Sequence, residues 1–119
     1  MSESILRQKS YAFALKVIRV YKQIVAENKE YVLSKQFLKA GTSIGALVRE
    51  AEFAQSKADF ISKLSISLKE ANETDYWVLL LRDSNYITIE SAIELLANDK
   101  ELISMLVSSI KTAKQSLGK

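Results

Sequence analysis

Four acidic residues of this 119-residue chain are candidates for chemistry: Glu50, Glu70, Glu73 and Asp75. Carboxylates that face each other inside a helical bundle can hold a di-iron centre, but such centres normally take a Glu-x-x-His motif from two helices. The chain contains no histidine. We therefore interpret the four acids as ion-pair or interface residues and expect no metal site.

The absence of both histidine and cysteine excludes several further kinds of chemistry. It rules out the Ser-His-Asp triad, the cysteine nucleophile, the usual zinc site and any disulfide. Glu50 or Glu70 acting as a general base would need a positioned partner, and the sequence offers none. We predict no catalytic residue, no cofactor and no enzymatic activity.

The composition is typical of one soluble domain spanning residues 1–119, with 48% hydrophobic and 26% charged residues. The stretch from Met1 to Ser10 lacks the apolar core of a signal peptide. Charged residues interrupt every apolar run before it is long enough to span a bilayer. We expect a cytoplasmic protein with no membrane segment.

Four helices are predicted by the spacing of apolar residues, in a chain with no proline and only three glycines. Ser56 is expected to cap the third helix and Thr88 the fourth. Short connections between amphipathic helices predict an all-α fold, the antiparallel up-and-down four-helix bundle. The predicted helices cover about residues 4–27, 32–54, 56–83 and 89–117.

The same spacing predicts which faces form the core. In the third helix the predicted core stripe is Phe60, Leu64, Leu68, Ala71 and Val78. The fourth helix reads as simply amphipathic, and the polar run 98–101 is expected to bend or interrupt it. Gly41 and Gly45 form a G-x-x-x-G motif that favours close approach of two soluble helices. The predicted seam of the fourth helix is Ala92, Leu96, Ile103, Leu106, Val107 and Ile110.

The first and third helices carry a second apolar face. A monomeric bundle buries one stripe per helix, so these extra faces predict self-association. Trp77 could instead stack on nucleic-acid bases beside Tyr76 and Arg82, but aromatic residues at helical spacing usually pack. We assign Trp77 to an interface. The candidate interface residues are Tyr11, Leu15 and Ile18 in the first helix and Ile66, Trp77 and Leu80 in the third.

Basic residues also share faces. Seventeen Lys and Arg against fourteen Asp and Glu give a formal net charge of +3, which favours polyanionic partners. In the first helix Lys9, Lys16 and Arg19 share one polar sector with Gln23, and this sector must meet solvent or an anion. The candidate nucleic-acid contacts are Lys9, Lys16 and Arg19 in the first helix and Lys35, Lys39 and Arg49 in the second.

Three stretches carry a family resemblance: SYAFALKVIRVYK from Ser10, KAGTSIGALVREAEFA from Lys39 and QSKADFISKLSISLKEANETDYWVLLL from Gln55. They resemble the four-helix bundle proteins encoded in intervening sequences of bacterial 23S ribosomal RNA genes. The resemblance implies a closed bundle that assembles as a homopentamer. A related branch, the accessory variability determinants of diversity-generating retroelements, binds nucleic acid and works with a reverse transcriptase. Leu47 and Arg49 depart from the family pattern, which has a small or polar residue and an acid there.

Two functions from different classes follow from these observations. The first is a non-enzymatic homopentameric adaptor that presents its basic residues to RNA or DNA. The alternative is a protein-binding scaffold or accessory subunit, for example to a reverse transcriptase, with no nucleic-acid contact of its own. The family name records gene location and does not by itself imply a ribosomal role.

Overall fold

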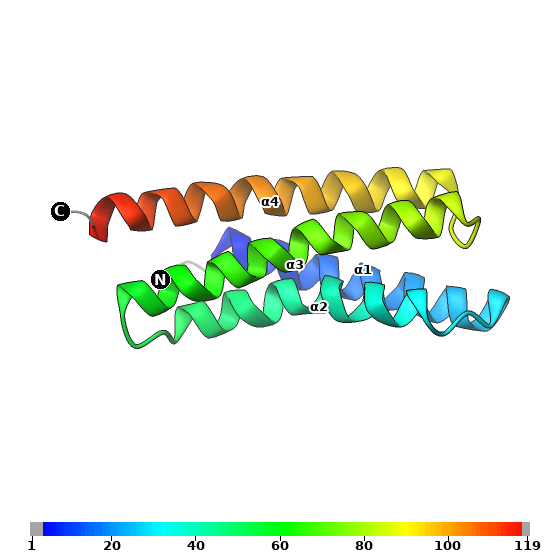
Figure 1. Ribbon diagram of the computed structural model, residues 1–119, viewed down its shortest axis with the longest axis horizontal. Coiled ribbons are helices and arrows are strands. Elements are labelled where there is room, and N and C mark those ends of the chain that lie inside the picture. Colours follow the sequence, from blue (N-terminus) through cyan, green and yellow to red (C-terminus); the bar gives the residue numbers. More distant parts are fainter. Residues whose placement is uncertain (1–3, 118–119) are drawn as a thin grey trace.

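A computed structural model describes residues 4–117 as four α-helices with no strand among them. The helices run alternately up and down in an elongated bundle (Figure 1). The predicted all-α four-helix bundle is confirmed, and each predicted helix end lies within two residues of the observed one. The helices are α1 (Ile5–Asn28), α2 (Leu33–Glu52), α3 (Lys57–Asp83) and α4 (Ile89–Leu117).

Side-chain caps fix the starts of three helices. The Ser56 hydroxyl oxygen accepts a hydrogen bond from the Asp59 backbone N–H at 3.0 Å, as predicted. The Thr88 hydroxyl oxygen accepts one from the Ser91 N–H at 3.0 Å, also as predicted. Ser4 caps α1 in the same way. These oxygens satisfy backbone donors that a helix start leaves without an internal partner.

Glu30 holds the turn between α1 and α2. Its carboxylate accepts hydrogen bonds from the backbone N–H groups of Val32, Leu33 and Ser34, at 2.8–2.9 Å. Desolvation raises the pKa of Glu30, but these backbone bonds outweigh it and leave the pKa below its usual value. Lys29, just before, takes a left-handed conformation with φ 52°, which ends α1.

Each helix buries one seam of residues spaced three and four apart, the repeat typical of antiparallel bundles. Leu64 lies in the seam of α3, which orients that helix as predicted. The seams are Leu6, Ser10, Phe13, Val17, Val20 and Ile24 in α1; Ser34, Phe37, Gly41, Ile44, Val48 and Ala51 in α2; Leu64, Ser67, Ala71, Thr74, Val78 and Leu81 in α3; and Ala92, Leu95, Asp99, Leu102, Leu106, Ile110 and Ala113 in α4.

The seam of α4 differs from the predicted one. Leu95 and Leu102 are buried, whereas the predicted Leu96 and Ile103 are half-buried and Val107 is 48% exposed. The prediction is confirmed for Ala92, Leu106 and Ile110. It was wrong for the other three residues because α4 carries two apolar stripes one residue apart, with the same spacing. The predicted interruption at 98–101 was also wrong, since the helix is continuous there.

The seam of α3 also differs from the predicted core stripe, because small polar residues occupy part of it. Phe60 and Leu68 are half-buried rather than central, while Ser67 and Thr74 are fully buried. The Ser67 hydroxyl donates to the Ile44 carbonyl oxygen at 2.9 Å. The Thr74 hydroxyl donates to the Glu70 carbonyl at 2.8 Å. These hydrogen bonds satisfy both hydroxyls and offset the free-energy cost of burying them.

Gly41 lets α1 and α2 approach closely. A Cβ atom placed on Gly41 would lie 2.7 Å from Val17 Cγ2, too close for an ordinary contact. A Cβ on Gly45 would lie 3.3 Å from the Ser10 carbonyl oxygen. The G-x-x-x-G motif therefore serves close packing of two helices, as predicted.

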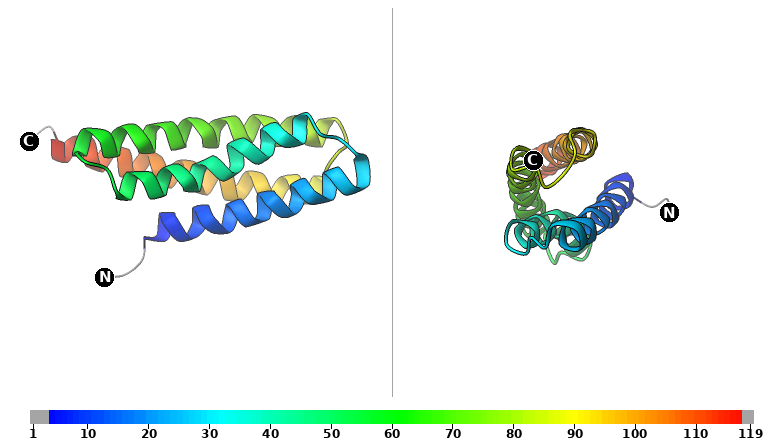
Figure 2. Two further views of the ribbon diagram at one scale, coloured as in Figure 1. Left: turned by 90° about the horizontal axis from the view of Figure 1, so that it is seen from below. Right: turned by 90° about the vertical axis from the view of Figure 1, so that its right-hand side faces the viewer.

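The four helices form a square in cross-section. Helices that follow each other in the chain pack together, and α4 returns to α1 to close the square. The α1–α4 side is the most sparsely packed of the four. Figure 2 shows the N-terminal half of α1 diverging from α4, while Ser10 of α1 stays close to Gly45 of α2. None of the described helices is long and apolar enough to cross a bilayer.

Candidate functional site

The basic sector of α1 faces an acidic sector of α4. Lys9 Nζ lies 2.9 Å from Glu101 Oε2. Lys16 Nζ lies 2.6 Å from Glu94 Oε1 and 2.7 Å from Asn98 Oδ1. The hydrogen bond from Lys16, and then its positive charge, hold the pKa of Glu94 below its usual value. The sequence predicts that this sector meets solvent or an anion. For Lys9 and Lys16 that anion is a carboxylate of the same chain.

The other candidate nucleic-acid contacts are free of ion pairs within the described part of the chain. Arg19, Lys35 and Lys39 are exposed, on the half of the α1–α2 hairpin nearest its turn. Arg49 lies over the Tyr11 ring, with its guanidinium carbon 5.7 Å from the ring centroid. The structure therefore brings together only some of the predicted basic residues.

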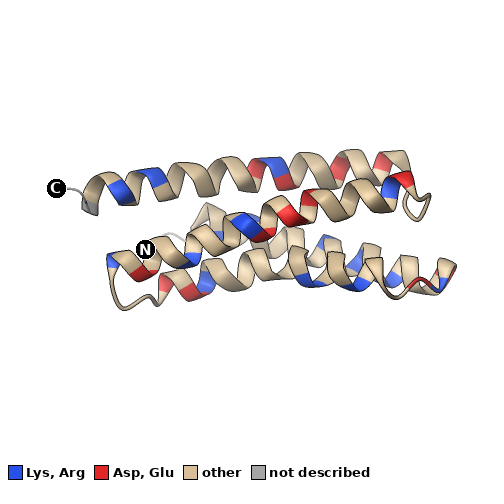
Figure 3. Cartoon of the chain, viewed as in Figure 1, with Lys and Arg blue, Asp and Glu red and all other residues tan. Residues whose placement is uncertain are grey.

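Lys22 and Lys29 extend this basic surface, although sequence reasoning did not single them out. Both are exposed, and both lie near the α1–α2 turn. Their positions along the chain, between Arg19 and Lys35, were the available signal. We call the set the hairpin basic surface: Arg19, Lys22, Lys29, Lys35 and Lys39. In Figure 3 the blue Lys and Arg segments of the ribbon recur along α1 and α2 toward this turn.

The candidate interface residues of α3 share one side of the bundle. Ile66 is exposed, and Trp77 and Leu80 are half-buried. Trp77 Nε1 donates to Glu73 Oε1 at 3.1 Å, and Glu50 of α2 pairs with Lys63 of α3 at 3.4 Å on this side. We call Ile66, Trp77 and Leu80, with Glu70 and Glu73 between them, the α3 patch.

The candidate interface residues of α1 lie along its own surface. Tyr11 and Leu15 are exposed and Ile18 is half-buried. Tyr11 also lines a shallow hollow of about 150 Å³ between α1 and α2, with Gly45 and Arg49. Because Tyr11 packs under the Arg49 guanidinium, part of this face is covered within the chain.

A third apolar surface lies between α3 and α4, and the sequence analysis missed it. Ile93 and Val107 are exposed and Ile103 is half-buried. They follow the core seam of α4 by one residue, and this repeated offset is the signal that could have found them. Next to them is an apolar groove of about 480 Å³. We call it the α4 groove; it is lined by Leu68, Val107, Ile110, Lys111, Lys114 and Gln115.

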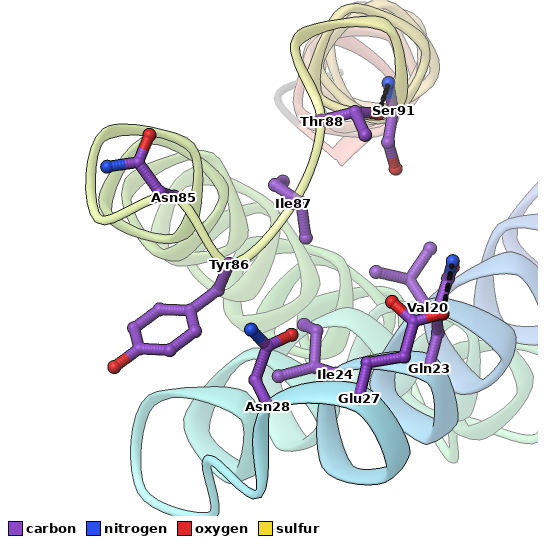
Figure 4. A pocket seen from close by; sticks show the side chains of 10 residues that line it. All are labelled: Val20, Gln23, Ile24, Glu27, Asn28, Asn85, Tyr86, Ile87, Thr88 and Ser91. Atoms are coloured by element: carbon purple, nitrogen blue, oxygen red, sulfur yellow. Dashed lines mark hydrogen bonds between the residues drawn. The ribbon is translucent and has the colours of Figure 1, made fainter.

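A polar hollow of about 270 Å³ lies between the end of α1 and the α3–α4 connection (Figure 4). Glu27 is its carboxylate, and Gln23 Nε2 donates to Glu27 Oε1 at 3.4 Å. Within the described residues, no group of three potential metal ligands occurs here or elsewhere. Its one carboxylate is bound by Gln23 and its Thr88 hydroxyl caps α4, so this hollow has no evident chemistry.

Asp99 is an acid that the sequence analysis treated only as part of the polar run 98–101 and did not single out. Its side chain is 0% exposed, in the seam between Leu95 and Leu102. Neither carboxylate oxygen has a hydrogen-bond partner among the described residues. Burial, and then the negative charge of Asp75 on α3, raise the pKa of Asp99 to about 8.

Comparisons with known proteins identify relatives of the chain. The family model for the 23S rRNA-intervening sequence protein matches residues 2–108. A crystal structure described as a protein with unknown function from the S23 ribosomal protein family of Bacteroides thetaiotaomicron is 51% identical. It has a TM-score of 0.89 and covers 90% of this chain and 99% of its own. No curated protein matches the chain.

Proposed function

Because the chain belongs to the 23S rRNA-intervening sequence protein family, we propose that it is a cytoplasmic, non-enzymatic homopentameric adaptor that binds RNA or DNA. The proposal rests on the difference in charge between the α1–α2 and the α3–α4 halves of the bundle (Figure 3). Residues 5–52 contain nine Lys and Arg against four acids, whereas residues 57–117 contain seven against nine. The hairpin basic surface therefore presents a concentrated positive charge to a phosphate backbone.

The proposed assembly rests on apolar surface that one bundle leaves uncovered. The α3 patch lies on the α2–α3 side and the α4 groove on the neighbouring α3–α4 side. Their charges are complementary, with Glu70 and Glu73 in the patch and Lys111 and Lys114 in the groove. Adjacent sides of a square bundle face about 90° apart, so a head-to-tail contact between them closes a ring of about four copies, and opening that angle to about 108° closes a ring of five.

We expect light scattering to give a mass near five chains, and Trp77→Glu to reduce it to that of one chain. The substitution places an unpaired charge in the apolar contact, which strongly disfavours burial. Phe53→Glu is the matched control, because Phe53 is an exposed aromatic residue in the α2–α3 connection, at the other end of the bundle from Trp77. A mass of 13.4 kDa for the unaltered chain at every concentration would remove the assembly from the proposal.

Charge reversal tests whether the contact is head-to-tail. Lys111→Glu with Lys114→Glu should dissociate the ring, and so should Glu70→Lys with Glu73→Lys. All four changes in one chain restore opposite charges across the contact and should restore the ring. A contact between two α3 patches would not be rescued in this way.

For nucleic acid, we expect Lys35→Glu with Lys39→Glu to weaken binding at least about tenfold at low salt, because phosphate contacts are electrostatic. Lys57→Glu with Lys69→Glu, on α3, makes the same change in net charge and should weaken binding less. Fluorescence anisotropy with structured RNA and duplex DNA measures both. Binding should depend weakly on sequence and fall steeply with added salt.

Lys9 and Lys16 are poor choices for this test. Their reversal would place a carboxylate against Glu101 or Glu94 and loosen the α1–α4 side as well. The two exposed lysines of α2 avoid that complication.

A protein-binding scaffold or accessory subunit is the second candidate function, with a reverse transcriptase as one possible partner class. It is favoured by the apolar α4 groove and by the pairing of Lys9 and Lys16 within the chain, which reduces the charge available to phosphate. An intact oligomer that binds neither RNA nor DNA at low salt would support this function over the first.

A further inference from the structure

The proposed function makes no use of Asp99, yet its position in the bundle is unusual. A carboxyl group with 0% exposure occupies a seam position that the other helices fill with apolar or small hydroxyl side chains. Neither of its oxygens receives a hydrogen bond within the described residues. An ionised carboxylate in such a place loses its hydration without compensation. The closed bundle is therefore compatible with the neutral acid and disfavours the anion.

The charged groups around Asp99 do not compensate for its ionisation. α3 contributes Asp75, which has the same sign. On α1, Lys9 and Lys16 are bound to Glu101 and Glu94, and Arg19 acts on Glu94. On its own helix the neighbouring Lys100 is exposed. Burial, and then the negative charge of Asp75, raise the pKa of Asp99 to about 8.

The α1–α4 side offers the least costly route for water to reach Asp99. It is the most sparsely packed side, and α1 already diverges along part of it (Figure 2). The contacts that bridge it include Lys16 with Glu94 and Asn98, and Lys9 with Glu101. On α4 these contacts lie on either side of residue 99. Polar contacts can be replaced by hydrogen bonds to water. They therefore separate more readily than the apolar contacts between α3 and α4.

We propose that Asp99 is a proton-operated latch between α1 and α4: protonated, it lets the two helices close, and ionised, it holds them apart. The inference is independent of nucleic-acid binding and of assembly. In the open form the carboxyl is hydrated and has an ordinary pKa of about 4. Opening therefore releases a proton between about pH 4 and pH 8, and becomes about tenfold more favourable for each pH unit in that window. Above about pH 8 both forms are ionised and the dependence levels off.

Thiol labelling can measure this opening, because the chain contains no cysteine of its own. Leu102→Cys places a thiol one turn from Asp99 in the core face of α4, at a position that is 1% exposed. Its labelling rate is compared in two backgrounds, Asp99 and Asp99→Asn, so that the pH dependence of the thiol itself cancels. We expect the ratio of the two rates to rise about a hundredfold from pH 6 to pH 8 and then level off.

Ser67→Cys is the matched control, since Ser67 is buried between α2 and α3. It should stay protected in both backgrounds, because the latch opens the other side of the bundle. Asp75→Asn removes the like charge and should move the levelling point to lower pH. A ratio that does not change with pH would overturn the latch, and so would labelling of both thiols in step, which indicates global unfolding. If a cysteine variant fails to fold, hydrogen exchange of the α1 amides at pH 8, with Asp99 and with Asp99→Asn, decides the same question.

Discussion

Replacing Asp99 with asparagine is expected to raise the free energy of unfolding by about 2–4 kcal/mol at pH 7. In the unfolded chain this carboxyl has a pKa of about 4. In the folded bundle, burial and then Asp75 raise its pKa to about 8. Folding between these values takes up a proton, which costs about 1.4 kcal/mol for each pH unit above 4. Asparagine has nearly the same shape and no proton to take up.

The sign of this effect is visible in the pH profile. Because the raised pKa belongs to an acid, its contribution favours the folded state least at high pH: stability falls from about pH 4 to pH 8 and is level above. Urea unfolding at pH 5, 6, 7 and 8 should show this decline in the unaltered chain and a flatter profile for Asp99→Asn. Glu90→Gln is the control, since it neutralises an exposed acid of the same helix. Parallel profiles for the unaltered chain and Asp99→Asn would contradict the prediction.

Leu64→Ala is expected to lower the free energy of unfolding by about 2–5 kcal/mol. Leu64 is only 2% exposed and lies in the α3 seam. Truncating it removes apolar contacts and leaves a cavity that the rigid helices around it close only in part. Urea unfolding measures the loss.

Ile5→Ala serves as the control for Leu64→Ala. It makes a comparable truncation at a residue that is 60% exposed, so it should cost less than about 1 kcal/mol. If Leu64→Ala changed stability by less than about 0.5 kcal/mol, the assignment of the α3 core face would be wrong.

The helix bounds were predictable because their signals are local. Ser56 and Thr88 cap backbone groups three residues away, so the sequence around them suffices. The choice of core residues in α4 was not predictable in the same way. Leu95 and Leu96 belong to parallel stripes with identical spacing, and only packing against α3 and α1 decides which is buried.

The burial of Asp99 was also not predictable from the sequence around it. Next to Asn98, Lys100 and Glu101 it reads as part of a solvent-exposed run, and its burial depends on the direction in which α4 faces its neighbours. The partners of Lys9 and Lys16 depend on that direction too. The basic and apolar faces could thus be found from spacing, whereas which face meets which could not.

The order of the helices around the square has a consequence for folding. Three of the four packed pairs among the described helices are joined by a short turn, and the exception, α1 with α4, is the most sparsely packed. Most native contacts are therefore close in sequence, and such low contact order is typical of domains that fold in microseconds to milliseconds. Docking of α1 on α4 closes the longest loop and forms the fewest contacts, so the loop-closure entropy is least well compensated there. We therefore place this docking last in the folding of the bundle. A helix that docks last and weakly is also the element most easily exchanged between copies, so domain swapping of α1 is the characteristic misassembly of this fold.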